Sequence, residues 1–181
     1  MRLLALALAA AFLALPASAQ TVSPLVEFAL EAGGDDVVTL VFEDGDTQTL
    51  TAGQGGTLAG GVLLRPAPGS PIGLRATAGY KFLLNASDNA SVRITRIPVE
   101  AVASYTFGPG VEIGAGPVLH LATSLNGDGF VDDIDFGTAV GGTVEAGYKW
   151  IALTYTAIQY TTEDDAEVDA SNVGLSLRLA F

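Results

Sequence analysis

The feature that most constrains this chain is a strict alternation of residue types at its end. In residues 173–181, VGLSLRLAF, large apolar residues occupy every second position, and glycine, serine, arginine and alanine fill the positions between them. Successive side chains of a β-strand point to opposite faces, so a period of two predicts a strand with one apolar and one small or polar face.

The same alternation recurs in seven earlier segments, which makes eight candidate strands. These segments are residues 26–32, 60–65, 72–82, 96–107, 111–121, 136–149 and 151–160. Near residues 93–96 the apolar positions shift by one, which predicts a β-bulge or the point where the strand leaves a membrane.

Short and long links alternate between these segments. The short ones are RPAPGSP, FGPG and YKW, whereas the long ones include DGDTQTLTAGQG, NASDNAS, NGDGFVDDID and TEDDAEVD. Most acids lie in the long links: Asp35, Asp36, Glu43, Asp44, Asp46, Asp88, Asp128, Asp132, Asp133, Asp135, Glu163, Asp164, Asp165, Glu167 and Asp169. Roughly ten-residue alternating strands with short turns at one end and long loops at the other predict an all-β fold, an eight-stranded antiparallel up-and-down transmembrane β-barrel.

The N-terminal segment reads as a signal peptide over residues 1–19. Arg2 precedes an apolar run over 3–15, and Ala17-Ser18-Ala19 is typical of a cleavage site. The barrel with its acidic external loops is then expected over residues 20–181. A net charge of −12 argues against nucleic acid as a partner, and the absence of cysteine excludes disulfides.

Together these features resemble the small OmpA/OmpX-type outer-membrane barrels of Gram-negative bacteria. The resemblance covers residues 20–181 and is most specific at the last strand, because its terminal Phe181 is similar to the signal that the barrel-assembly machinery reads. It implies an outer-membrane location, contact with outer-membrane lipid and lipopolysaccharide, and assembly as a monomer. Aromatic girdles are expected from Tyr80, Phe82, Tyr105, Phe107, Tyr148 and Trp150. A soluble periplasmic β-sandwich is the alternative fold.

Charged residues on the polar faces predict a filled lumen. An eight-stranded barrel has an interior only wide enough for side chains, and charges buried there must pair. The expected lumen network consists of Glu27, Glu31, Arg65, Arg75, Lys81, Arg96, Glu100, Glu112, His120, Glu145, Lys149 and Arg178. Such a lumen argues against a general diffusion porin.

An enzymatic role is not favoured by the sequence. His120 is the chain's one histidine, and where lipid A deacylases carry a His-x-Ser pair this chain has Ala122. Nucleophilic catalysis needs a nucleophile, a base and an orienting acid in mutual reach. We therefore expect His120 to face the lumen, hydrogen-bonded to a carboxylate.

Residues 124–135, SLNGDGFVDDID, resemble a calcium loop. Asn126, Asp128, Asp132 and Asp135 fall near the ligand positions around a central glycine. However, Ser124 takes the first position, and the residues that follow alternate as a strand rather than a helix. We therefore expect an acidic loop without a resident cofactor, with at most weakly bound Ca²⁺ or Mg²⁺.

The leading functional hypothesis is a non-enzymatic outer-membrane barrel that serves envelope integrity, adhesion or surface interaction. The alternative is a narrow channel or porin-like carrier for small solutes, in line with a resemblance to the OmpW group. A lipid A-modifying enzyme is the third and least favoured hypothesis.

Overall fold

The computed structural model describes residues 20–41, 47–87, 90–127, 133–162 and 165–181. The predicted signal peptide lies outside this part of the chain. Within the described residues, no helix is long and apolar enough to cross a membrane.

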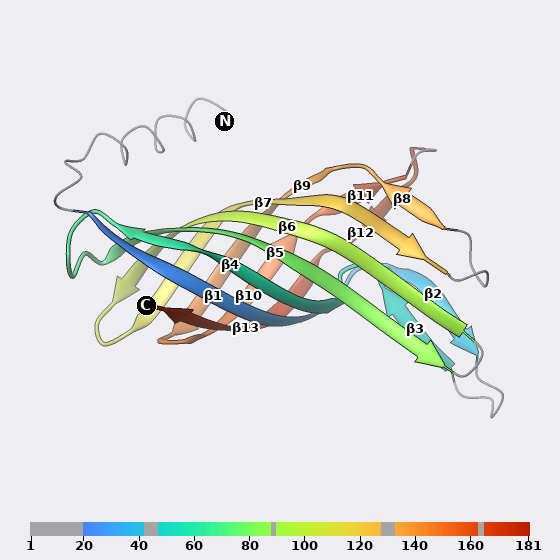
Figure 1. The fold of residues 1–181 in the computed structure, drawn as a ribbon, viewed down its shortest axis with the longest axis horizontal. Coiled ribbons are helices and arrows are strands. Elements are labelled where there is room, and N and C mark those ends of the chain that lie inside the picture. The colour runs from blue at the N-terminus through green and yellow to red at the C-terminus, as the bar shows by residue number, and fades with distance from the viewer. Residues whose placement is uncertain (1–19, 42–46, 88–89, 128–132, 163–164) are drawn as a thin grey trace.

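Eight strands form one closed antiparallel sheet (Figure 1). They are β1 (Thr21–Ala32), β4 (Gly55–Arg65), β5 (Ile72–Ser87), β6 (Ala90–Phe107), β7 (Val111–Asn126), β9 (Ala139–Tyr148), β10 (Ile151–Ala157) and β13 (Asn172–Ala180). Each strand pairs with the next along the barrel, and β13 returns to β1, so that no barrel edge is left open. The predicted eight-stranded antiparallel up-and-down barrel is confirmed, and the alternative β-sandwich is wrong because the sheet closes.

Glycines allow the sheet to curve tightly, and the closest approaches are at three of them. A Cβ atom at Gly61, Gly116 or Gly141 would overlap a carbonyl oxygen of the neighbouring strand. The polar face of the alternation is therefore rich in glycine for a steric reason, since a barrel of this size brings its inner surface close together.

The outer face of the barrel is a continuous apolar band. Leu153, Leu175 and Leu177 are each more than 40% exposed, which would be costly for a protein surrounded by water. Two rows of exposed aromatic residues border this band. The row on the side of the short turns contains Tyr105, Phe107, Tyr148, Trp150 and Phe181, and the row on the loop side contains Phe28, Tyr80, Phe82 and Tyr155.

The separation of the two rows follows from the strand register. Ile72 pairs with Tyr105 of the first row, and Phe82 of the second row lies ten residues further along β5. At about 3.3 Å per residue and a strand tilt of roughly 40°, the band is about 25 Å tall.

The predicted bulge is present, but its extra residue is in a different strand. The register between β6 and β7 shifts between Thr95 and Ile97, at the expected place. Burial nevertheless alternates without a break along β6, where Val92, Ile94 and Arg96 are all buried. The additional residue is in β7, where Ala122 has φ of 48°, a value that lets the strand take up one residue more than its partner.

Five short strands at the loop end were not predicted as separate elements. β2 (Asp36–Val41) and β3 (Thr47–Thr51) form a hairpin, β8 (Ile134–Phe136) pairs with β7, and β11 (Gln159–Thr161) pairs with β12 (Glu167–Asp169). Figure 1 shows these strands gathered at the end opposite to the short turns, where β5, β6 and β7 extend beyond the rest of the barrel. We call these five strands, together with the turn 52–54, the cap.

Candidate functional site

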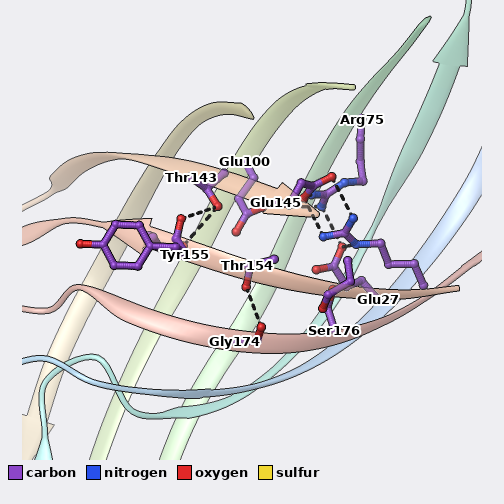
Figure 2. Close-up of polar contacts among 12 residues, drawn as sticks. Glu27, Arg75, Glu100, Thr143, Glu145, Thr154, Tyr155, Gly174 and Ser176 are labelled. Atoms are coloured by element: carbon purple, nitrogen blue, oxygen red, sulfur yellow. Dashed lines mark hydrogen bonds and ion pairs between the residues drawn. The ribbon is translucent and has the colours of Figure 1, made fainter. Parts of the chain in front are cut away.

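Two arginines and three glutamates from five strands form a charge cluster in the middle of the lumen. Arg75 lies 2.7 Å from Glu27 and 2.6 Å from Glu145 through its two terminal nitrogens. Arg178 bonds Glu145 at 2.7 Å and lies 3.2 Å from Glu27. Figure 2 shows Arg75, Glu27 and Glu145 turned towards one another inside the barrel. These charges fill the lumen at this level.

The glutamates of this cluster are not equivalent. Glu145, whose side chain is 2% exposed, accepts one hydrogen bond from Arg75 and two from Arg178. Glu100 lies 3.6 Å from Arg75, and its side chain is 23% exposed. Glu27 and Glu145 each contact both arginines, and Glu145 accepts the larger number of hydrogen bonds, whereas Glu100 is at the margin of the cluster.

A second charged layer lies nearer the loops. Lys81, whose side chain is 1% exposed, forms an ion pair of 3.0 Å with Glu31, which also accepts a hydrogen bond of 2.6 Å from the Thr57 hydroxyl. The Lys81 ammonium donates a further bond of 2.8 Å to the carbonyl of Gly53. This lysine therefore joins the barrel wall to the turn 52–54 of the cap.

Arg96, the register partner of Lys81 on the neighbouring strand β6, holds the same turn. Its two terminal nitrogens donate to the carbonyls of Ala52 and Gln54, at 2.6 and 2.5 Å. The guanidinium lies 5.8 Å from the ring centre of Tyr160, and the Tyr160 hydroxyl lies 2.6 Å from Nδ1 of His120. The expectation of a carboxylate partner for His120 is wrong, because β11 brings a tyrosine there. The buried histidine takes part in packing the cap.

Three segments that are distant in sequence cross closely above this layer. Gly53 donates to the carbonyl of Gly33 at 2.9 Å, and a Cβ atom at Gly53 would lie 2.7 Å from the Ser171 carbonyl. Asp35 and Asp169 exchange two hydrogen bonds of 2.7 and 2.9 Å. Hydrogen bonds from the hydroxyl and then the backbone N–H of Ser171 hold the pKa of Asp169 below its ordinary value. The first and last loops are thereby fixed to each other.

Apolar side chains complete the cap. One buried cluster consists of Val38, Leu50, Val92, Ile94 and Leu125, and a second consists of Ala52, Val118, Ala139, Ile158, Tyr160 and Ala170. The first cluster packs the β2–β3 hairpin against the inner face of the extended β6 and β7, and Leu50 has no exposed surface. The loop end of the lumen is therefore filled by a small hydrophobic core.

Three predicted members of the lumen network lie apart from it. Arg65 ends β4, half-buried, and forms no ion pair with any described residue. Glu112 accepts a bond of 3.2 Å from the Thr106 hydroxyl. Lys149 is exposed in a short turn, with its ammonium 5.0 Å from the Tyr148 ring centre. All three lie at the turn end, where water can solvate an unpaired charge.

The candidate calcium loop is described only in part. Asp128 and Asp132 lie outside the described residues, and Asp135 is in β8, where it pairs with Ser124. Asn126 donates its side-chain N–H to Asp133 at 3.0 Å. Among the described residues, no three histidine, cysteine or acidic side chains gather as metal ligands.

Sequence reasoning missed the residues that form the cap. Residues 37–42, VVTLVF, and 47–51, TQTLT, are two runs of strand-forming residues around an Asp-Gly turn, which is typical of a hairpin. The length and acidity of this segment favour an external loop, and its β-branched residues are the signal that indicates the hairpin.

Comparison with solved structures places this architecture among known folds. Neisserial surface protein A superimposes with a TM-score of 0.50 at 11% identity, over 90% of this chain and 99% of that one. The fold is that of the small eight-stranded outer-membrane barrels. Ail, the attachment invasion locus protein of Yersinia pestis, aligns at 9% identity over 89% of this chain and 99% of its own, with a TM-score of 0.46. No family model matches the chain, and no curated protein matches its sequence.

Proposed function

We propose that the chain is an outer-membrane protein of a Gram-negative bacterium, exported by a cleaved signal peptide over residues 1–19 and inserted as a monomer by the barrel-assembly machinery. The apolar band of about 25 Å between two aromatic rows supports this, because it matches the hydrocarbon layer that such barrels span. A closed barrel also satisfies its backbone hydrogen bonds within lipid. Its immediate partners would be outer-membrane lipid and lipopolysaccharide.

Gel mobility and cell fractionation test this location. The protein refolded in detergent should migrate differently before and after boiling, because a closed barrel resists denaturation by the gel detergent. Expressed with its signal peptide, the protein should fractionate with the outer membrane and begin at Gln20. A folded, water-soluble monomer without detergent would contradict the proposal.

Within that membrane we propose a non-enzymatic role at the cell surface, in envelope integrity, adhesion or another surface interaction. The observation that carries this proposal is the closed lumen: two charged layers and the apolar cap occupy it. The loop end of the barrel carries an excess of acids, since Asp36, Asp165 and Glu167 are exposed and Arg93 is the one exposed base among the described residues there. Such a surface favours divalent cations and basic partners.

Planar-bilayer recording separates this role from the alternative of a narrow channel. The refolded protein should insert without conductance steps, while a general porin in the same bilayer provides the positive control. Steady unit conductance from the unmodified chain would contradict the closed lumen and favour the channel. Unchanged lipid A masses in cells that express the protein would agree with the absence of lipid-modifying activity.

Cell binding tests the surface role directly. Cells that display the protein should adhere to a polylysine-coated surface better than cells without it, and added salt should reduce the difference by screening. Neutralising the exposed Asp165 and Glu167 as asparagine and glutamine should reduce adhesion, whereas neutralising Glu112 at the opposite end should not. Equal effects of both changes would argue against recognition through the cap.

A further inference from the structure

One carboxylate accepts two hydrogen bonds from an Asn–Gly dipeptide at the loop end of β7. Asn126–Gly127 is the only such dipeptide in the chain. Oδ1 of Asp133 accepts the backbone N–H of Gly127 at 3.0 Å, and Oδ2 accepts the side-chain N–H of Asn126, also at 3.0 Å. The backbone nitrogen and the neighbouring side-chain amide are therefore held side by side.

We infer that this is a self-modification site, at which Asn126 loses ammonia through a succinimide with Asp133 as the acid–base group. The Gly127 nitrogen attacks Cγ of Asn126, so that an N–C bond forms and the bond from Cγ to Nδ2 breaks. Asp133 takes the proton from the Gly127 nitrogen through Oδ1 and returns a proton through Oδ2 to the departing nitrogen, which leaves as ammonia. Water then opens the imide to aspartate or isoaspartate.

The contacts place the acid–base group that this step requires. A general base must lie within about 2.6–3.2 Å of the group whose proton it takes, and both bonds to Asp133 meet that condition. Gly127 has no side chain to obstruct the ring closure. Asn126 and Asp133 are exposed, so ammonia can leave and water can enter, while the carboxylate fixes the orientation of the reacting groups.

The product changes the charge of the loop at a defined place. Asn126 is the register partner of Arg93 across β6 and β7. Directly opposite residues on paired strands are close enough for their side chains to interact, so a carboxylate at position 126 gains a cation as its neighbour. The reaction also adds one negative charge to the acidic loop that resembles a calcium site.

The experiment follows ammonia loss in the full-length barrel refolded in detergent micelles. Mass spectrometry of the peptide containing residue 126 gives the conversion, and enzymatic methylation of isoaspartate identifies the product. Asp133→Asn, which keeps an acceptor but cannot carry the proton, should slow the reaction by about 10²-fold, the lower range for a positioned acid–base group. Asp135→Asn is the matched control, because Asp135 is an exposed aspartate two residues away in β8, and it should leave the rate unchanged.

Two further measurements distinguish chemistry from mere restraint. Between mildly acidic and neutral pH, the unmodified protein should react at a nearly constant rate, whereas the Asp133→Asn rate should rise in proportion to hydroxide. The folded protein at mildly acidic pH should also react faster than the same chain unfolded in urea. If Asp133→Asn reacts as fast as the unmodified chain, or if folding slows the reaction, Asp133 protects the dipeptide and the inference is wrong.

Discussion

Replacing single glutamates in the central cluster should reveal how its charges stabilise the barrel. Glu145→Gln and Glu100→Gln make the same chemical change, and each takes the cluster of three acids and two bases from one net negative charge to zero. An effect of net charge alone would therefore be equal in the two variants. Any difference must come from the contacts that each carboxylate makes.

Those contacts predict a large difference. Glu145 is almost fully buried and accepts three hydrogen bonds from Arg75 and Arg178, so glutamine at this position leaves two buried guanidinium groups short of acceptors. Removing one partner of a buried ion pair costs about 3–5 kcal/mol. Glu100 makes one longer contact, 3.6 Å from Arg75, and its loss leaves both guanidinium groups with their closer acceptors, so we expect a cost on the scale of one hydrogen bond, about 1 kcal/mol. The two variants should differ by at least about 2 kcal/mol.

Denaturant unfolding in lipid vesicles measures this difference. The fluorescence of Trp150, the chain's single tryptophan, should report unfolding because its ring lies in the turn-side aromatic row. The shift of the midpoint multiplied by the slope gives the change in the free energy of unfolding. Equal destabilisation by the two replacements, or a loss below about 1 kcal/mol for Glu145→Gln, would refute the reasoning from contacts.

Three other perturbations address assembly, the cap and the acidic loop. Deleting Phe181 should lower the yield in the outer membrane of cells while the purified chain still refolds in micelles; an undiminished yield would argue against an assembly signal. Leu50→Ala should destabilise the cap by about 2–5 kcal/mol, seen as faster amide exchange in β3, whereas Leu58→Ala on the lipid face should leave that exchange unchanged. Calcium should bind the loops diffusely, at about 10⁻⁴–10⁻³ M, so replacing Asp128 and Asp132 by asparagine should reduce binding only in proportion to charge; saturable one-to-one binding abolished by that change would indicate a dedicated site.

The barrel could be predicted from the sequence because its strands obey a local rule. Each alternating segment specifies its own two faces, and the short links restrict neighbours to antiparallel pairs. The shift of the apolar positions near residue 96 has a different origin from the register shift, because burial alternates evenly along β6. Val92 and Ile94 face inward and pack in the cap, whereas Ile97 faces outward, and the extra residue of the bulge, Ala122, lies in the partner strand.

The lumen contacts were less accessible to sequence reasoning. Alternation places Glu145, Arg75 and Arg178 inside the barrel, but which charges meet depends on strand stagger, which one sequence does not encode locally. Residues at the turn end alternate in the same way as those in the middle of the barrel. Arg65 is therefore separated from the lumen network by its position along the barrel axis, which the alternation does not specify. His120 bonds Tyr160 because the fourth loop folds inward, and no local pattern predicts that return.

The close crossing of the segments around Gly33, Gly53 and Ser171 also imposes an order on folding. Asp35 bonds Asp169, and Gly33 and Gly53 contact Ser171, so contacts of the cap join residues more than a hundred positions apart. Forming such a contact costs the entropy of closing a long loop, unless other strand pairings have already shortened that loop. Pairing of β13 with β1 provides that shortening, since it places Ala32 opposite Val173. We therefore expect the cap to form late in folding, after β1 has paired with β13 and closed the barrel.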